Sequence, residues 1–263
     1  MQIGTPPCKM QAMLPPSELS KNQVDRLGDR LRKGNIGDDD LRLLDSYRRS
    51  FSDAYEIVVG QIRNQLNLEP TGRPAKSTTS IIDKLQRESI RLSQVQDIAG
   101  CRLIVNDIAT QDDIVDKLRS LFEKSAIVDR REHPSHGYRA IHTIVDSGGK
   151  LIEIQVRTQL QHLWAELSEK FSDIIDPAIK YGGGNPETLR SLSAASDQIR
   201  DVEIAESILH DILSTVAIER PLDTNRKITQ ARGLIDARKR RAASLVALLD
   251  AITLERTHDD LSD

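Results

Sequence analysis

A predicted β-hairpin is the feature that most constrains the fold of this chain. Two runs in which apolar and polar residues alternate, Tyr138–Asp146 and Lys150–Arg157, flank the turn residues Ser147, Gly148 and Gly149. Alternation with period two is typical of strands that bury one face, and a short glycine-containing loop joins antiparallel neighbours. The sequence therefore predicts a sheet with one apolar face and one polar face.

The other elements predict a mixed α/β fold around this hairpin. Short apolar runs predict further strands at Cys101–Asn106 and Ala126–Asp129, with a helix at Gln111–Lys124 between them. Helical periodicity predicts two N-terminal helices, one from Ser17 or Ser20 to near Gly34 and one from Asp38 through Val58. It also predicts helices over Ser77–Arg91 and Thr158–Ile175. After Pro186 it predicts two long helices, which are separated near Pro221. The helix after Asp38 is expected to bury one stripe formed by Leu41, Leu44, Tyr47, Phe51, Tyr55 and Val58.

Composition and length limit the class of protein. The chain has 263 residues, 38% of them hydrophobic and 29% charged, with a formal net charge of -3, which is typical of a folded globular protein. We expect a flexible arm over 1–16, one domain over 17–184 and a C-terminal helical hairpin over 185–263. No apolar run is long enough to cross a membrane and no secretory signal is apparent, so a cytoplasmic protein without a membrane partner is predicted. Cys8 and Cys101 suggest neither a disulfide framework nor a metal site.

The polar face of the hairpin carries the first candidate site residues. Glu153, Gln155 and Arg157 share one face of their strand, although an edge strand with a solvated face would show the same alternation. Tyr138 and His142 share a face of the preceding strand, and Gly137 leaves room for close backbone approach. Tyr138 is therefore a candidate stacking platform for a nucleobase or, alternatively, a core residue, while His142 also fits a structural role.

Asp97 is the second candidate carboxylate. It stands just before the strand Cys101–Asn106, where it could pair across the sheet with Glu153. Two carboxylates in this arrangement can hold Mg²⁺ against phosphate oxygens. Asp97 could alternatively cap a helix or turn.

A basic stripe is predicted on the helix that follows Pro74. Lys76, Ser80, Lys84 and Arg87 recur at intervals of four, four and three, and therefore share one helix face. Like charges one turn apart repel one another, so the stripe favours a bound anion, although a solvated basic face would have the same pattern. Arg73 and Arg102 could extend it.

Taken together, four motifs resemble the RelA/SpoT synthetase-domain family over residues 73–170. They are Lys76…Ser80…Lys84, Asp97-Ile98-Ala99-Gly100-Cys101-Arg102, Gly137-Tyr138-Arg139-Ala140-Ile141-His142 and Glu153-Ile154-Gln155-Val156-Arg157-Thr158. The resemblance implies a nucleotidyltransferase-like fold, a mixed sheet flanked by helices, here with N-terminal helices and a C-terminal helical hairpin. It also implies a small stand-alone protein, because the family's metal-dependent hydrolase domain has no counterpart in this sequence.

The resemblance further implies an activity and residue roles. Members of the family transfer the β,γ-pyrophosphate of ATP to the 3′-hydroxyl of GDP or GTP and so make ppGpp or pppGpp. Asp97 and Glu153 would hold Mg²⁺, Glu153 would also help to deprotonate the attacking hydroxyl, and Tyr138 would stack on the acceptor base. Phosphates would be held by Lys76, Lys84 and Arg102, with Arg73, Ser80, His142, Gln155 and Arg157 as further substrate-binding residues.

Two departures from the family pattern leave other functions open. Arg73-Pro74-Ala75-Lys76 replaces Arg-x-Lys, so Arg73 is offset, and His133-Pro134-Ser135-His136 replaces the Pro-Lys-x-Asn that usually precedes Gly-Tyr. Arg130 or Arg131 could supply the missing positive charge. The alternatives are a toxin-type relative that modifies the tRNA 3′ end or makes adenosine alarmones, for which Arg238-Lys239-Arg240-Arg241 offers basic residues, and a catalytically inactive nucleotide-sensing protein. A protein antitoxin or a second copy of the chain would be possible partners.

Overall fold

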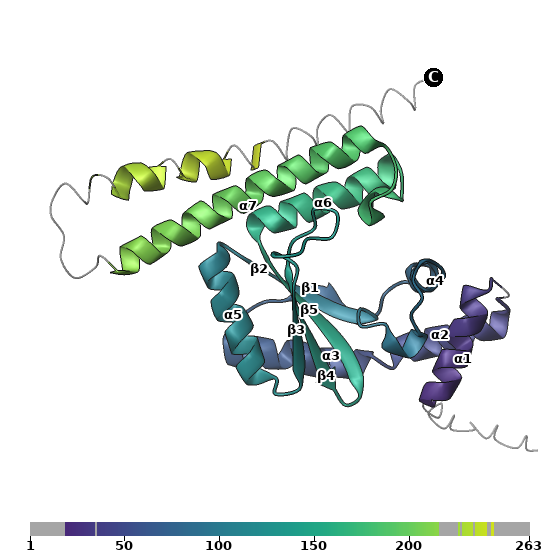
Figure 1. The fold of residues 1–263 in the computed structure, drawn as a ribbon. Helices are drawn as coiled ribbons and strands as arrows, with labels where there is room; N and C mark the ends of the chain where they lie inside the picture. Colours follow the sequence, from purple (N-terminus) through teal and green to yellow (C-terminus); the bar gives the residue numbers. More distant parts are fainter. Residues whose placement is uncertain are drawn as a thin grey trace, which may run out of the picture.

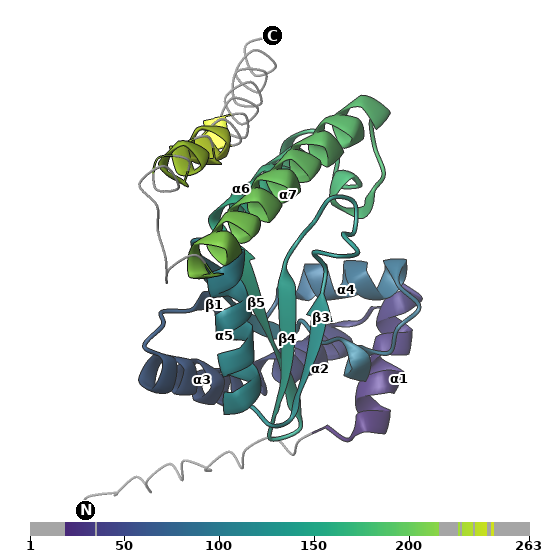
Figure 2. The same ribbon diagram turned by 60° about the vertical axis from the view of Figure 1, so that its left-hand side comes forward.

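The structure is a computed structural model that describes residues 19–34, 36–215, 226, 228–233, 235–240 and 243–244. A twisted sheet lies at the centre, helices α3 (Ser52–Gln61) and α5 (Ile108–Leu121) pack along it, and α6 (Gln159–Ile174) and α7 (Pro186–Thr215) lie side by side across one end (Figures 1 and 2). The predicted arm over 1–16 lies outside the described residues. The predicted mixed α/β fold with a sheet flanked by helices is confirmed.

The sheet has five strands in the order β1-β2-β5-β4-β3. Their bounds are β1 Thr71–Arg73, β2 Ala99–Val105, β3 Ser125–Asp129, β4 Ile141–Ser147 and β5 Lys150–Thr158. The central pair, β2 and β5, is parallel, whereas every other pair is antiparallel. The β4–β5 hairpin turns through Gly148 and Gly149, whose φ angles of 61° and 81° fit the left-handed turn that a two-residue loop requires.

The apolar face of the sheet forms the main core. Ile152, Ile154 and Val156 of β5 are fully buried there and pack with side chains of α3 and α5. The predicted alternation in β5 is therefore confirmed, with Glu153 on the opposite face. The prediction that β4 begins at Tyr138 was wrong, because regular pairing starts only at Ile141.

The N-terminal helices differ from the prediction in one respect. Helix α1 (Lys21–Arg32) begins at a capping box formed by Ser20 and Gln23, as a serine at that position favours. The single helix expected after Asp38 is in fact two, α2 (Asp38–Arg49) and α3, which break at Ser50. Leu41 is consequently exposed, whereas the other five residues of the predicted stripe are buried. A π-helical turn, η1 (Ile62–Leu66), follows α3.

The helix predicted over Ser77–Arg91 is α4 (Thr78–Arg87), which is capped by Ser77 and ends four residues early. A 3₁₀ turn, η2 (Leu92–Gln94), then leads toward β2. A second 3₁₀ turn, η3 (Ile179–Tyr181), connects α6 to α7. Among the described residues, no helix is long and apolar enough to cross a membrane.

After α7, the structure describes only short helical pieces between residues 226 and 244, and these lie along α7 (Figure 1). Lys239 links them to the domain, because its Nζ lies 3.1 Å from Glu206 Oε1 of α7 and donates to the carbonyl of Asn106. Most of the second helix of the predicted hairpin, and the separation near Pro221, lie outside the described residues. The prediction of a hairpin over 185–263 stays a prediction.

Candidate functional site

A cleft of about 460 Å³ opens on the polar face of the sheet. It lies where β1, the start of β2 and the middle of β5 meet, with α6 contributing one side chain. Its lining comprises Thr71, Gly72, Arg73, Lys76, Asp97, Ile98, Gly100, Cys101, Arg102, Glu153, Gln155, Arg157 and Glu169. Seven of the predicted site residues, Arg73, Lys76, Asp97, Arg102, Glu153, Gln155 and Arg157, therefore share one cavity, although they come from distant parts of the sequence.

Asp97 sits between two lysines at the mouth of β2. Its Oδ2 lies 2.7 Å from Lys76 Nζ, and its Oδ1 lies 3.0 Å from Lys84 Nζ. Burial alone would raise the pKa of this carboxyl, but the two ammonium charges and their hydrogen bonds lower it to about 2. Asp97 is therefore ionised at neutral pH, and the helix-capping alternative has no support in its contacts.

The predicted basic stripe divides into two parts. Lys76 precedes α4, yet its ammonium group and that of Lys84 both pair with the carboxylate of Asp97. The anion beside these two lysines is therefore a side chain of the protein itself. Ser80 is not part of the cleft lining, and its hydroxyl accepts a hydrogen bond from the capping Ser77. Arg87 turns away, pairs with Glu88 and lies 3.5 Å from the centre of the Tyr181 ring.

Glu153 belongs to a closed ring of hydrogen bonds on the polar face. Its Oε1 lies 2.7 Å from His142 Nδ1, and its Oε2 accepts from Gln155 Nε2 at 2.6 Å. Arg157 Nη2 donates to Gln155 Oε1 at 2.6 Å and to the Tyr138 hydroxyl at 2.9 Å, and that hydroxyl lies 2.9 Å from His142 Nε2. Burial would raise the pKa of Glu153, but its bonds to His142 and Gln155 lower it. The ring thus holds an ionised carboxylate in a fixed orientation.

Tyr138 reaches this ring from the loop before β4 rather than from the strand itself. Its side chain is half-buried, packs against the apolar cluster around Trp164, and carries the Arg157 guanidinium 5.0 Å from its ring centre. Burial raises the pKa of its hydroxyl. Gly137, expected to leave room for close backbone approach, makes room for Trp164, because a Cβ there would lie 2.7 Å from the indole ring.

Three arginines in the cleft have no anionic partner. Within the described part of the chain, Arg73, Arg102 and Arg157 form no ion pair, and the buried Nε atoms of Arg102 and Arg157 have no hydrogen-bond partner. Arg157 is only 4% exposed. A buried guanidinium group such as that of Arg157 is costly without a carboxylate unless a ligand supplies the negative charge, whereas Arg102 is half-buried and Arg73 is exposed. Phosphate oxygens match these donors in charge and geometry.

Some lining residues were missed by the sequence analysis. The short strand β1 was interpreted only as Pro-rich punctuation, yet it pairs Arg73 with Gly100 and so places the arginine beside Arg102, despite its offset in the motif. Glu169 projects from α6, where its helical spacing from His162 and Glu166 was the available signal. Of the two arginines expected to replace the missing lysine, Arg131 is held by Asp129 and Asp112, whereas the charge of Arg130 acts on Tyr138.

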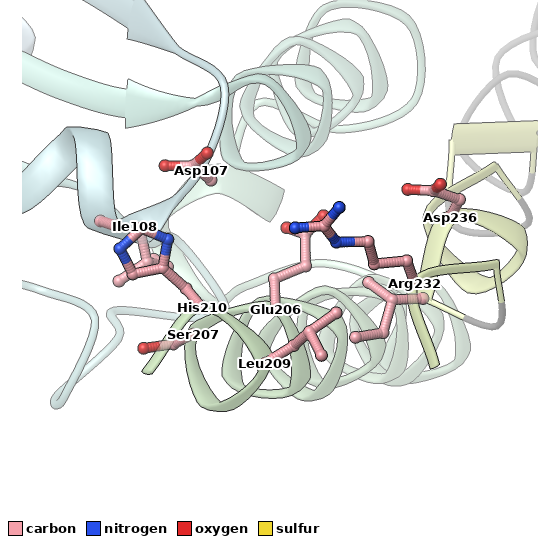
Figure 3. A pocket seen from close by; sticks show the side chains of 10 residues that line it. Asp107, Ile108, Glu206, Ser207, Leu209, His210, Arg232 and Asp236 are labelled. Atoms are coloured by element: carbon pink, nitrogen blue, oxygen red, sulfur yellow. The ribbon is translucent and has the colours of Figure 1, made fainter. Parts of the chain in front are cut away.

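A second pocket, of about 260 Å³, lies between the start of α5, helix α7 and residues 232, 235 and 236 (Figure 3). Asp107 caps α5 there by accepting from the backbone N–H of Thr110. Glu206 pairs with Lys239, and the guanidinium of Arg232 points toward Glu206 (Figure 3). Glu206 in this pocket thus faces positive charges.

The donor set of the cleft fits a divalent metal shared with a substrate. Among the described residues, no group of three or more His, Cys, Asp or Glu side chains is arranged to hold a metal ion. Mg²⁺, however, commonly takes one or two carboxylates and completes its shell with substrate phosphates and water. Asp97 and Glu153 both line the cleft, and the charge of Asp97 tends to raise the pKa of Glu153, so a cation between them would relieve this repulsion.

The fold and cleft define an α/β protein with a charged cavity on the polar face of a mixed sheet. Residues 72–172 match the family model described as "Region found in RelA / SpoT proteins". The resemblance to the RelA/SpoT family is thereby confirmed, and this segment is a RelA/SpoT region. It contains every predicted site residue.

Curated relatives agree with this assignment. The chain is 32% identical over 170 residues to an uncharacterized protein of Mycobacterium tuberculosis, and the match covers 62% of each chain. It is 35% identical over 137 residues to the GTP pyrophosphokinase YjbM of Bacillus subtilis, and this match covers 46% of this chain and 60% of YjbM. It thus spans about three fifths of these relatives. The small alarmone synthetase 1 of Bacillus subtilis is 26% identical, with a TM-score of 0.49 over 68% of this chain and 100% of that one.

Proposed function

We propose that the protein is a pyrophosphokinase that transfers the β,γ-pyrophosphate of ATP to the 3′-hydroxyl of a guanosine nucleotide. The observation that carries the proposal is the cleft in which three arginines without carboxylate partners lie beside two ionised carboxylates. The name of the relative YjbM, GTP pyrophosphokinase, supports the same reaction class. ATP and GDP or GTP are the substrates proposed for this chain.

The reaction assigns a task to each part of the cleft. The acceptor's 3′-oxygen forms a bond to the β-phosphorus of ATP, the bond from that phosphorus to the α,β-bridging oxygen breaks, and AMP leaves. Glu153, which is ionised at neutral pH, would accept the hydroxyl proton. Arg73 and Arg102 would hold the donor phosphates in line, because preorganised cations stabilise charge in the transition state, while Arg157 holds the Tyr138 hydroxyl.

Asp97, Lys76 and Lys84 form the part of the site that must rearrange. Phosphates that enter the cleft compete with Asp97 for the two ammonium groups, which are 2.7 and 3.0 Å from the carboxylate. Asp97 would then be released to hold Mg²⁺ together with Glu153, and the bound ion would neutralise negative charge on the phosphates. We therefore propose that the two lysines neutralise Asp97 before the donor binds.

Tyr138 is proposed as the acceptor platform. Its hydroxyl is held by Arg157 and lies beside His142, so the ring orientation is fixed relative to Glu153. A base stacked on this ring would place its ribose close to the carboxylate that accepts the proton. The transfer requires the 3′-hydroxyl to be held in line with the donor phosphorus, and this arrangement would hold it there.

Transfer of label tests the proposal directly. The protein is incubated with Mg²⁺, ATP labelled at its γ-phosphate and, separately, GDP, GTP, ADP or deacylated tRNA. Labelled pyrophosphate on GDP or GTP, with an equal amount of AMP, is the expected result. Label on tRNA alone or on ADP alone would show that this molecule, and not a guanosine nucleotide, is the acceptor. A folded protein that binds nucleotides but labels none of them and forms no AMP would contradict the proposed activity.

A further inference from the structure

Helix α7 lies outside the matched segment 72–172, yet it contacts the loop that carries Tyr138. Ser196 of α7 is buried, and its hydroxyl donates to the carbonyl of Gly137 at 2.6 Å. The same hydroxyl accepts from Arg139 Nε at 3.0 Å. One side chain of α7 therefore binds both residues that flank Tyr138.

The partners of Arg139 extend this connection. Its guanidinium is 6% exposed, donates from Nη1 to the carbonyl of Arg131 at 2.6 Å, and lies 3.5 Å from Asp197 of α7. Arg139 thus joins the two ends of the loop 131–139 to each other and to α7. Buried donors that lose their acceptors are strongly unfavourable, so this loop geometry depends on Ser196.

Two further contacts fix the same loop from the α6–α7 side. Trp164 of α6 donates from Nε1 to the carbonyl of Leu192 in α7 at 2.8 Å, and its ring fills the space beside Gly137. His136 has a φ of 54°, and its ring packs against Gly182 in the connection between η3 and α7. The loop in which this chain departs from the Pro-Lys-x-Asn pattern is therefore supported by Trp164 of α6 and by Gly182 in the connection to α7.

We propose that Ser196 is a positioning residue for the acceptor: through Gly137 and Arg139 it fixes Tyr138, so that helix α7 determines acceptor affinity and selectivity. This inference rests on the proposed function only in assigning Tyr138 to the acceptor. The donor phosphates are proposed to lie in the cleft around Arg73 and Arg102, which Ser196 does not contact, whereas Tyr138 is not one of the residues that line this cleft. Loss of the hydroxyl should therefore affect one substrate and spare the other.

The single tryptophan of the chain provides a binding readout that needs no turnover. Trp164 touches Gly137 and α7, so its fluorescence should change when a nucleotide stacks on Tyr138. GDP serves as the acceptor probe, and a non-hydrolysable ATP analogue is titrated separately by calorimetry. Binding of GDP can thus be measured even in a protein that transfers nothing, which separates failure of this inference from failure of the proposed function.

Three variants test the inference. Ser196→Ala should weaken GDP binding about tenfold, a loss that binding arithmetic converts to about 1.4 kcal/mol, with unchanged binding of the ATP analogue. Ser196→Thr keeps the hydroxyl and should restore GDP affinity. Ser193→Ala, at an exposed position on the same helix, should match the wild type. In a transfer assay the apparent KM for GDP should rise while that for ATP stays constant.

Two results would overturn the inference. The first is wild-type GDP affinity in a folded Ser196→Ala protein. The second is an equal loss of GDP and ATP-analogue affinity together with a lowered melting temperature, which would show a purely structural role. If Ser196→Ala does not fold, Arg139→Lys keeps the charge and removes the Nε donor, and unchanged GDP affinity in that variant would equally reject the proposal.

Discussion

The two hollows of the molecule differ in how their charges are compensated. In the pocket between α5 and α7, Glu206 pairs with Lys239, Asp107 caps a helix and Arg232 points toward a carboxylate (Figure 3). In the cleft on the polar face of the sheet, Lys76 and Lys84 share one carboxylate, and three arginines have no ion pair among the described residues. The carboxylate of Glu206 in the pocket is thus paired within the chain, whereas the cleft holds arginines that form no ion pair with the carboxylates beside them.

This difference is a better guide to function than the size or shape of either hollow. Ion pairs such as that of Lys239 stabilise a fold only modestly and require no ligand. A buried arginine without a counter-charge, such as Arg157, is unfavourable to the free protein, and a polyphosphate would relieve that cost. The cleft therefore gains more from a bound anion than the pocket does.

The strongest test of the comparison removes one carboxylate from each hollow. Asp97→Asn and Glu153→Gln should each reduce transfer at least about a hundredfold, because they remove charge needed for Mg²⁺ and for proton acceptance. Glu206→Gln in the pocket is the matched control and should keep the wild-type rate. Label transfer and thermal melting are measured for all three. Near-wild-type rates in both cleft variants with folded protein would remove these carboxylates from the site.

A second test compares one arginine from each hollow. Arg102→Gln should weaken binding of ATP about 10- to 100-fold, since charge-assisted hydrogen bonds are worth about 1.5–3 kcal/mol. Arg232→Gln should leave that affinity unchanged. Calorimetric titration gives both constants, and stabilisation of the wild type by ATP in a melting experiment gives an independent check. Equal affinities in the two variants would contradict the assignment of phosphates to the cleft.

The free energy of unfolding should depend on pH through the ion pairs that Asp97 forms with Lys76 and Lys84. The carboxyl has a pKa of about 2 in the folded protein against 3.8 for a free side chain, so its contribution is present above about pH 4 and is lost as the pH falls toward 2. The shift corresponds to about 2 kcal/mol. Denaturant unfolding of the metal-free protein between pH 2 and 5 should show a steeper loss of stability in the wild type than in Asp97→Asn. Parallel curves would show that the pair contributes nothing.

Substitutions of Tyr138 have the smallest expected effect, and they test whether this residue belongs to the site or to the core. Tyr138→Ala should weaken GDP binding about tenfold, because stacking on an aromatic ring is worth about 1–3 kcal/mol per base. Tyr138→Phe keeps the ring and most of this affinity but loses the bonds to Arg157 and His142, so its transfer rate should fall more than its affinity. Fluorescence titration and rate measurements separate the two effects. Loss of stability in Tyr138→Ala without selectivity for GDP would assign the ring to the core.

The sequence predicted the elements better than their boundaries. Alternation in Lys150–Arg157 identified β5 and its polar face, because burial of one face is a local requirement. The break between α2 and α3 was missed, since the apolar spacing from Leu44 to Val58 continues across it. Strand β1 was missed because three exposed residues carry no apolar pattern, and their strand geometry comes only from pairing with β2.

The sequence named several of the residues that line the cleft but not the contacts that connect them. Glu153, Gln155 and Arg157 were placed on one face, yet their closed ring through Tyr138 and His142 depends on the β4–β5 register. Lys76 and Lys84 were assigned to one helix face, whereas the contact that joins them is Asp97, on another segment. The role of Ser196 had no sequence signal, because a small hydroxyl on an amphipathic helix has no distinctive spacing.

The parallel pairing of β2 with β5 has a consequence for how the protein acquires its site. The hairpin of β4 and β5 closes over two residues, but β2 joins it from about fifty residues earlier in the chain. Local contacts form before distant ones, so we expect the hairpin to form early and β2 to dock late. Asp97 and Arg102 arrive with β2, in the same step that seals Cys101 and Leu103 into the core. A partly folded chain would therefore hold Glu153 without Asp97, its proposed partner at the metal, and under the proposed function it would not consume ATP before folding is complete.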